Sequence, residues 1–215
     1  MKNPHEQALD VEAFYDRIIR YYDVSYKFNR YSQSLEQYLN DWLPVLPNNP
    51  RILDAGCGTG LLTEALLKTI GYPARIAGID LSAKSIGVAQ KTIGRDSDST
   101  NKIQFIQANL LNMPFQDESF DLVVTSGALE YVSLQMGLAE IDRVLAPGGY
   151  LIYLPLRPSL AGYFLAITFR AKVYLRDEVL EALSARFSVI SEHGFKASEP
   201  IGWSKTAMLC RKLRS

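Results

Sequence analysis

Residues Arg51 to Leu62 read RILDAGCGTGLL, and this stretch predicts the fold of the chain. An apolar run ends in Asp54, and three glycines follow at alternate positions, Gly56, Gly58 and Gly60. An amphipathic segment comes next, so the pattern predicts a buried strand, a tight loop and the start of a helix. Glycines at such a corner allow positive φ and let a ligand approach the backbone, and the first helical turn offers N–H donors.

The spacing of this loop indicates the kind of ligand. It is Gly-x-Gly-x-Gly, whereas the dinucleotide fingerprint needs one more residue before its third glycine to place a pyrophosphate at the helix N-terminus. The carboxylate of Asp54 would repel a phosphate but could pair with a cationic amine. The loop therefore favours a nucleoside that carries an amino acid, and it disfavours the alternative of a nicotinamide oxidoreductase.

Composition and charge narrow the class of protein. A chain of 215 residues is long enough for one α/β domain, and its 23 basic and 23 acidic side chains cancel, which argues against a nucleic-acid partner. Cys57 and Cys210 lie far apart, so neither a disulfide framework nor a metal site is expected. The polar N-terminus and the lack of an 18-residue apolar window predict a cytoplasmic protein without a transmembrane segment.

Apolar runs alternate with helical patterns along the rest of the chain, which is typical of a parallel α/β sheet. The helical patterns cover residues 11–45, 60–70, 83–94, 137–146 and 176–186, and the strand patterns after the first cover 75–80, 103–108, 122–125, 148–155, 187–195 and 206–213.

Polar residues follow several of these strands. Asp80 ends the second predicted strand, where a carboxylate can accept both hydroxyls of a ribose. The alternative is that Asp80 or Ser82 caps the next helix. Asn109 follows the third strand and Ser126 ends the fourth. Because ligands of open α/β sheets bind outside the carboxyl ends of the strands, these side chains are expected at one site.

The stretch DAGCGTG after a strand resembles the first motif of class I S-adenosylmethionine-dependent methyltransferases. Three other stretches are similar to the same family, and to its methyltransferase type 11 group, which includes ubiquinone and menaquinone C-methyltransferases. They are YDRIIRYYD near the N-terminus, IQFIQANLLNMPFQDESFDLVV, and RVLAPGG before a strand. The resemblance covers roughly residues 14–155.

This resemblance implies a Rossmann-like, doubly wound sheet of seven strands in the order 3-2-1-4-5-7-6, with strand 7 antiparallel and an N-terminal helical cap. It also implies a single methyltransferase domain over residues 1–215. We expect a cap at 1–48, a cofactor-binding core at 49–155, a substrate-cover insertion at 156–175, and a C-terminal helix and strands at 176–215.

The implied methyl donor is S-adenosyl-L-methionine, with S-adenosyl-L-homocysteine as product. Asn109 stands where the family usually has Asp, so an amide oxygen would accept from the adenine amino group. The residues that the resemblance places at the cofactor are Asp54, Ala55, Gly56, Cys57, Gly58, Gly60, Asp80, Leu81, Asn109, Leu110, Leu111, Ser126, Gly127 and Tyr22.

Methyl transfer from a sulfonium is an in-line displacement, so the protein chiefly supplies alignment and desolvation, and a base only where the acceptor must lose a proton. The candidate catalytic residues are Glu130, Tyr22 and His193. The alternative for Glu130 is a surface acid in the first turn of a helix. We place His193 in the turn between strands 6 and 7, where a surface role is the alternative.

We expect the acceptor to be a small hydrophobic or amphiphilic molecule with an anionic group that Arg157 or Arg170 would bind. Methylation of an oxygen, a nitrogen or a carbon atom is equally compatible with the sequence. The site loop TSGALEY lacks the Asn-Pro-Pro-Tyr type of motif found in amino-methylating nucleic-acid enzymes. The apolar stretch SLAGYFLAITF predicts a buried cover helix, with a weak membrane-surface contact via residues 159–172 as the alternative. A catalytically inactive S-adenosylmethionine-binding regulatory protein is the alternative function.

Overall fold

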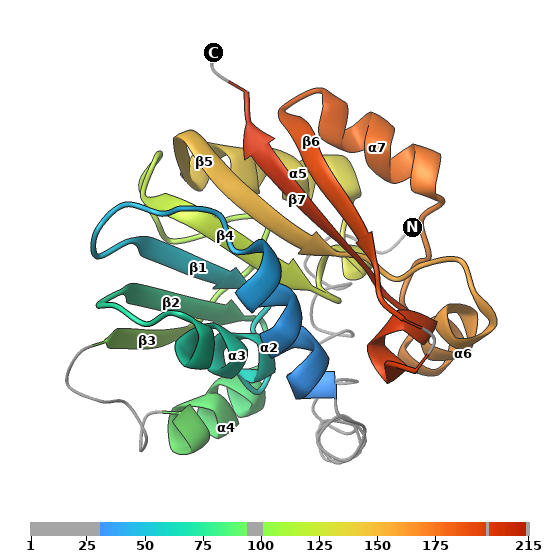
Figure 1. Cartoon of the computed structure of the whole chain (residues 1–215), viewed down its shortest axis with the longest axis horizontal. Coiled ribbons are helices and arrows are strands. Elements are labelled where there is room, and N and C mark those ends of the chain that lie inside the picture. Colours follow the sequence, from blue (N-terminus) through green and yellow to red (C-terminus); the bar gives the residue numbers. More distant parts are fainter. Residues whose placement is uncertain (1–30, 94–100, 197, 214–215) are drawn as a thin grey trace.

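The computed structural model describes residues 31–93, 101–196 and 198–213. In this part of the chain seven strands form one sheet in the order β3-β2-β1-β4-β5-β7-β6, which confirms the predicted order (Figure 1). The strands are β1 (Arg51–Ala55), β2 (Arg75–Asp80), β3 (Lys102–Gln107), β4 (Phe120–Ser126), β5 (Leu145–Leu154), β6 (Phe187–Gly194) and β7 (Thr206–Lys212).

Strand direction places the ends that matter for ligand binding at one edge. Strands β1 to β5 all run parallel to one another, and β7 runs antiparallel to its neighbours β5 and β6, as predicted. The carboxyl ends of β1 to β5 therefore lie along one edge, and β6 ends at the same edge. This is the edge of the sheet at which ligands of α/β proteins bind.

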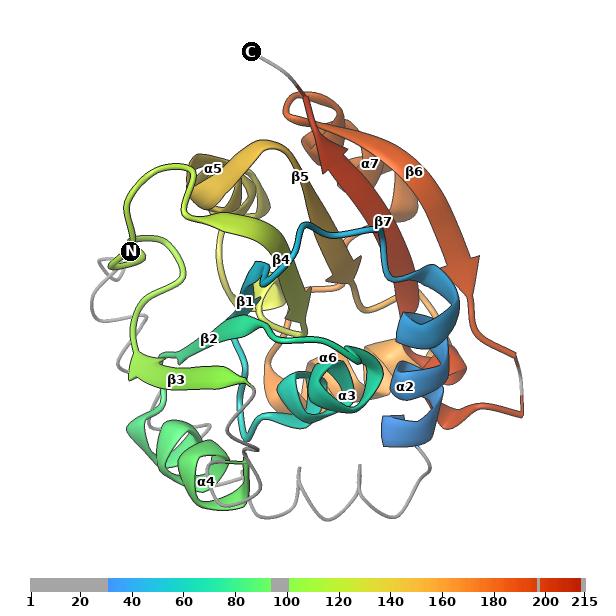
Figure 2. The same ribbon diagram turned by 60° about the vertical axis from the view of Figure 1, so that its left-hand side comes forward.

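Helices cover both faces of the sheet (Figure 2). One face carries α2, α3 and α4, and the other carries α5 and α7. Their bounds are α2 (Tyr31–Trp42), α3 (Leu61–Thr69), α4 (Ala83–Ile93), α5 (Leu134–Val144), α6 (Leu160–Phe169) and α7 (Arg176–Ser184), with short 3-10 helices η1 (Leu129–Tyr131) and η2 (Pro200–Trp203).

The central strands are apolar on both sides because both sides are covered. In β1, Ile52 packs in the core beneath α2 and α3, whereas the next residue, Leu53, packs in the core beneath α5 and α7. Adjacent residues of β4, Leu122 and Val123, divide in the same way. This alternation follows from the two-residue repeat of a strand.

The boundary between α5 and β5 differs from the prediction. The helix begins at Leu134 rather than at Gly137, because the side chain of Ser133 caps it by accepting a hydrogen bond from the N–H of Met136. It ends at Val144, and β5 already begins at Leu145, with an irregularity where β5 pairs with the start of β4. Pro147 therefore lies within the strand and does not end the helix.

The predicted cap and cover are represented by one helix each. Of the predicted N-terminal cap, the structure describes α2, which buries Tyr31, Leu35 and Leu39 against the sheet. Helix α6 lies beyond the carboxyl ends of the parallel strands (Figure 1). No helix among the described residues is both long enough and apolar enough to cross a membrane.

Two glycines test the packing of β2 and α4. A Cβ at Gly78 would lie 2.6 Å from the ring of Phe105, whereas a Cβ at Gly87 in α4 would meet nothing within 4 Å. We expect Gly78→Ala to destabilise the protein by about 1–3 kcal/mol through overpacking. Gly87→Ala should stabilise it by up to about 1 kcal/mol, because Ala favours a helix. Urea unfolding of both variants measures this, and equal effects would contradict the packing described.

Candidate functional site

The loop after β1 is held against the end of β2 by its backbone. The N–H groups of Gly56 and Cys57 both donate to the carbonyl of Ile79, each at 2.8 Å. Gly56 has a φ of 81°, and a Cβ there would lie 2.2 Å from the Cβ of Ala128, two residues after the end of β4. The position therefore requires glycine, both for its left-handed backbone and for the close approach of β4.

Asp80 forms a second tie between the loop and β2. Its Oδ2 accepts a hydrogen bond from the N–H of Gly58 at 2.9 Å, and its Oδ1 accepts one from the N–H of Ser82 at 2.9 Å. Gly58 has a φ of 55°, and a Cβ there would meet nothing within 4 Å. The loop thus presents open backbone beside a half-buried carboxylate.

Asp54 is a buried carboxylate beneath this loop, with only 1% of its surface exposed. Its Oδ2 accepts a hydrogen bond from the hydroxyl of Thr63 at 2.6 Å, whereas its Oδ1 has no hydrogen-bond partner within the described chain. Burial and, to a smaller extent, the nearby charge of Asp80 raise the pKa of Asp54 to about 7, against the lowering effect of the hydrogen bond from Thr63. A cation near Oδ1 would offset the cost of this burial.

Helix α3 begins directly after the loop. Gly60 is its N-cap with a φ of 93°, and no side chain caps the helix there. The N-terminus of a helix carries partial positive charge and favours a carboxylate or other anion. Asp54, whose Oδ1 has no hydrogen-bond partner among the described residues, therefore lies just before the loop, and the uncapped N-terminus of α3 lies just after it.

The ends of β3 and β4 lie at the same edge as this loop. Asn109 is exposed, and its Oδ1 accepts a hydrogen bond from the N–H of Leu111 at 2.9 Å. The side chain of Leu110 is buried in the core, and Leu111 is half-buried beside it. Ser126 ends β4 half-buried. Gly127 follows with a φ of 74°.

Three other residues predicted at the cofactor lie around the loop. The side chain of Ala55 is fully buried in the core under α5 and α7. Cys57 is buried against α4, where burial raises the pKa of its thiol well above the usual value. Leu81 follows Asp80, and its carbonyl accepts from the side chain of Gln107 at 3.0 Å. A contact of these residues with a ligand stays a prediction.

Glu130 lies in η1, directly after β4, and it is not the surface acid considered as an alternative, since it is 3% exposed. Its Oε1 accepts the N–H of Leu156 at 2.8 Å and lies 3.8 Å from the Nζ of buried Lys205. Its backbone carbonyl accepts the N–H of Lys172. Leu156 and Lys172 flank α6, so Glu130 anchors both ends of the segment that carries α6.

The other two predicted catalytic residues are Tyr22 and His193. Tyr22 falls outside the described residues. His193 lies within β6 rather than in the turn after it, and its ring packs against those of Tyr38, Trp42 and Phe195 at centroid distances of 5.2 to 5.8 Å. Because β6 is the third strand from β4, His193 lies about 14 Å to the side of that strand at the usual spacing.

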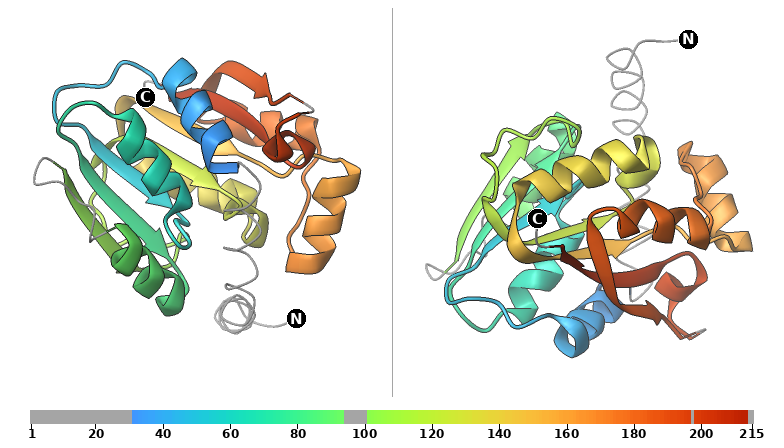
Figure 3. Two further views of the ribbon diagram at one scale, coloured as in Figure 1. Left: turned by 60° about the horizontal axis from the view of Figure 1, so that its bottom comes forward. Right: turned by 90° about the horizontal axis from the view of Figure 1, so that it is seen from above.

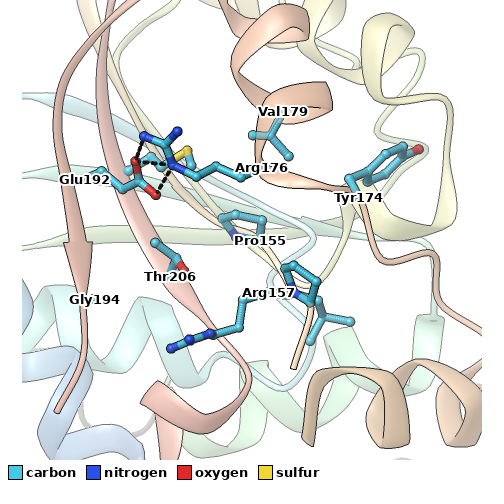
Figure 4. Close-up of a pocket in the computed structure, with 11 residues that line it drawn as sticks. Pro155, Arg157, Tyr174, Arg176, Val179, Glu192, Gly194 and Thr206 are labelled. Carbon is cyan, nitrogen blue, oxygen red and sulfur yellow. Dashed lines mark hydrogen bonds and ion pairs between the residues drawn. The ribbon is translucent and has the colours of Figure 1, made fainter. Parts of the chain in front are cut away.

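A cavity of about 430 Å³ lies beyond the end of β5, beside α7 and the strands β6 and β7 (Figure 4). At its rim Arg176 forms an ion pair with Glu192 at 2.7 Å. Arg157, one of the two predicted anion-binding residues, also lines it and donates to the carbonyl of Gly202. The remaining lining residues are largely apolar: Pro155, Leu156, Pro158, Tyr174, Val179, Gly194, Thr206 and Met208.

Comparison with known proteins identifies the family. Residues 53–153 match the family model described as a methyltransferase domain. The chain is 32% identical over 172 residues to the demethylmenaquinone methyltransferase of Chlorobaculum tepidum, an alignment that covers 70% of this chain and 67% of that protein. The chain belongs to the class I S-adenosylmethionine-dependent methyltransferase family.

Other relatives of this methyltransferase family member differ in length and substrate. This chain is 38% identical over 110 residues to phthiotriol/phenolphthiotriol dimycocerosates methyltransferase 1 of Mycobacterium ulcerans, and the alignment covers 51% of this chain and 38% of that protein. Several curated relatives are matched over only 38% to 61% of their length. The fold is similar to that of geranyl diphosphate C-methyltransferase from Streptomyces coelicolor, with a TM-score of 0.67, 19% identity, and 85% and 79% coverage.

Sequence reasoning missed three residues that shape the site. Thr63 bonds the buried Asp54, Ala128 packs against Gly56, and Lys205 pairs with Glu130. Thr63 stands in the first turn of the helix after the loop, so its nearness to Asp54 was readable from the pattern. The other two depend on pairing between distant strands, which no local pattern indicates.

The pKa of Asp54 gives a pH dependence with a definite sign. The folded pKa of about 7 lies above the usual 3.8, so the unfolded chain loses this proton first as the pH rises. The free energy of unfolding should therefore decline between pH 3.8 and about 7. Asp54→Asn removes this contribution, and its stability advantage over the unaltered chain should widen from pH 4 to pH 8 in urea titrations. A constant difference would contradict it.

The buried pair of Glu130 and Lys205 gives a second stability prediction. Glu130→Gln leaves the ammonium of Lys205 buried without its counter-charge and should cost about 3–5 kcal/mol. The double variant Glu130→Gln with Lys205→Met removes that charge and should recover much of this loss. Urea unfolding of the two single variants and the double variant measures the coupling. Purely additive effects would show that the two side chains do not interact.

Proposed function

We propose that this chain transfers a methyl group from S-adenosylmethionine to a small lipophilic acceptor. The observation that carries the proposal is the buried carboxylate of Asp54, whose Oδ1 lacks a hydrogen-bond partner among the described residues, beneath a loop of open backbone. A dinucleotide would bring phosphates to this acid. An adenosyl ligand that ends in an amino acid brings an ammonium group, which fits the unpaired oxygen.

The residues at this edge fit the parts of the donor. Asp80 places a half-buried carboxylate at the end of β2, where an acid suits the hydroxyls of a ribose, and Gly58 leaves room for a ligand against the backbone. The uncapped N-terminus of α3 suits the carboxylate of the amino-acid end. Asn109, with an exposed amide, supports the adenine assignment made from the sequence, together with the backbone of Leu110. Ser126 and Gly127 lie between this cluster and the acceptor side.

The donor supplies a methyl group on a sulfonium that its own positive charge already activates. The chain then has to align the acceptor with the methyl group and exclude water. In this proposal Glu130 is a positioning residue, because its Oε1 accepts from Leu156 and faces Lys205 and its backbone carbonyl accepts from Lys172, although its buried Oε2 has no hydrogen-bond partner among the described residues.

The cavity beyond β5 supports a lipophilic acceptor. Its lining is largely apolar. Arg157 also lines it and is a candidate to bind an anionic group of the acceptor, whereas Arg176 is already paired with Glu192. The names of the relatives support this class, since one is named for demethylmenaquinone and another for phthiotriol and phenolphthiotriol dimycocerosates. We assign residues 49–155 to donor binding and residues 156–175 to covering the acceptor.

Methyl transfer itself is the test of the function. The full chain is incubated with methyl-labelled S-adenosylmethionine and a panel of quinols, phenolic lipids and isoprenoid phosphates. The proposal expects label in the lipophilic fraction and stoichiometric S-adenosylhomocysteine in the aqueous one. Donor binding without transfer to any member of the panel would favour a regulatory protein.

Donor affinity tests the ribose assignment. Asp80→Ala should weaken binding of S-adenosylhomocysteine about tenfold, in line with ~1–3 kcal/mol for a charge-assisted hydrogen bond. Asp80→Asn keeps one acceptor oxygen and should fall between. Asp177→Ala removes an acid whose side chain is 97% exposed in α7 and serves as the control. Isothermal titration calorimetry measures all three, and an Asp80→Ala affinity equal to that of the control would refute the assignment.

A further inference from the structure

Helix α6 exposes apolar side chains that a folded protein ordinarily buries. Its sequence is LAGYFLAITF, which is apolar on nearly every side, and such helices are typically buried in a core or in a membrane. The cover helix predicted from this sequence is nevertheless not buried on its outer side. Leu160 is 94% exposed, Ile167 81% and Phe164 68%.

Helix α6 is capped and packed on its inner side, so the exposure of these side chains does not result from fraying of the helix. A Cβ at Gly162 would lie 2.1 Å from the carbonyl of Arg157, so the inner face of the helix packs directly on the chain before it. Ser159 caps the helix by accepting from the N–H of Gly162 at 3.0 Å. Ala166 is buried on the same inner side. Leu160, Phe164 and Ile167 share the opposite face through their spacing.

Aromatic residues with polar tips border this face. Tyr163 on α6 is 48% exposed, and Trp203 on the neighbouring η2 is 55% exposed. The hydroxyl of Ser159 donates to the carbonyl of Trp203, which holds η2 against the start of α6. Tyr and Trp combine an apolar ring with one polar group, and they are enriched where an apolar phase meets water.

The charges within the segment that carries α6 have one sign, whereas Glu199 precedes the neighbouring η2. Residues 156–175 contain Arg157, Arg170 and Lys172 and no Asp or Glu. Arg157 precedes the helix, and Arg170 and Lys172 follow it, so basic side chains flank the apolar face at both ends. This pattern matches the headgroups of anionic lipids above their acyl chains.

We propose that this surface docks on an anionic lipid bilayer. The α6 surface consists of Leu160, Tyr163, Phe164, Ile167 and Trp203, flanked by Arg157, Arg170 and Lys172, and α6 stands at the periphery of the fold (Figure 3). A symmetric contact with a second copy would bring like charges together, which disfavours a dimer through this face. The short helix lies on the bilayer and does not span it.

The proposal goes beyond the proposed function and does not require it. Arg157 and Pro158, which precede α6, also line the cavity beyond β5. A protein docked through α6 would therefore hold that cavity close to the lipid surface, where lipophilic molecules are dissolved. Lipid binding and donor binding are measured separately, so either can fail without the other.

Vesicle flotation tests the docking. The full chain is mixed with vesicles of phosphatidylcholine containing 30% phosphatidylglycerol, or with pure phosphatidylcholine, and spun through a density gradient. We expect the protein to float with the anionic vesicles and much less with the neutral ones. The combined variant Leu160→Ser, Phe164→Ser and Ile167→Ser should lower the partition coefficient at least tenfold. Arg170→Gln with Lys172→Gln should lower it about fivefold per charge on anionic vesicles only.

Matched controls separate docking from general stickiness. Val45→Ser removes an apolar side chain that is also 94% exposed but lies in the loop before β1, and it should float like the unaltered chain. Circular dichroism and binding of S-adenosylhomocysteine show that each variant is folded. The proposal is overturned if the unaltered chain stays with the unbound fraction, or if the triple variant floats equally well. It is also overturned if sedimentation shows a dimer that the triple variant abolishes.

Discussion

The Asp80 carboxylate fixes the geometry on which the candidate site depends. By accepting from the backbone of Gly58 and of Ser82, it ties the loop after β1 to the turn after β2. The backbone bonds from Gly56 and Cys57 to Ile79 reinforce the same junction. These hydrogen bonds hold the loop in the conformation that leaves its backbone open above Asp54. The parallel direction of β1 to β5 then brings the ends of β3 and β4 to that junction.

Charge at the junction explains the preference for a cationic nucleoside. Two carboxylates, Asp54 and Asp80, interact beneath and beside a loop that offers no basic side chain to a phosphate. Burial raises the pKa of Asp54 to about 7, and no described group donates a hydrogen bond to its Oδ1. The ligand preference at this edge of the sheet therefore follows from Asp54, whose buried Oδ1 lacks a hydrogen-bond donor among the described residues. In this proposal the chain promotes methyl transfer chiefly by aligning the acceptor with the methyl group and by excluding water.

Local signals in the sequence predicted the strands and the glycine corner, because apolar runs and glycine spacing are local, whereas the strand order came from the family resemblance. Sequence reasoning misplaced the start of α5, since the cap at Ser133 competes with the apolar pattern. It placed His193 in a turn and missed Lys205, because both positions depend on partners far away in the chain: aromatic rings of α2 for the first and the η1 acid for the second. Composition showed that α6 is apolar, but only packing shows which side faces water.

Calorimetric titration of the full chain with S-adenosylmethionine, and separately with NAD, measures the central claim directly. The account predicts saturable binding of the sulfonium nucleoside at one site per chain and no detectable heat from NAD. Binding of NAD in the absence of any response to S-adenosylmethionine would contradict it, since a pyrophosphate would then be lying against the acids of this loop.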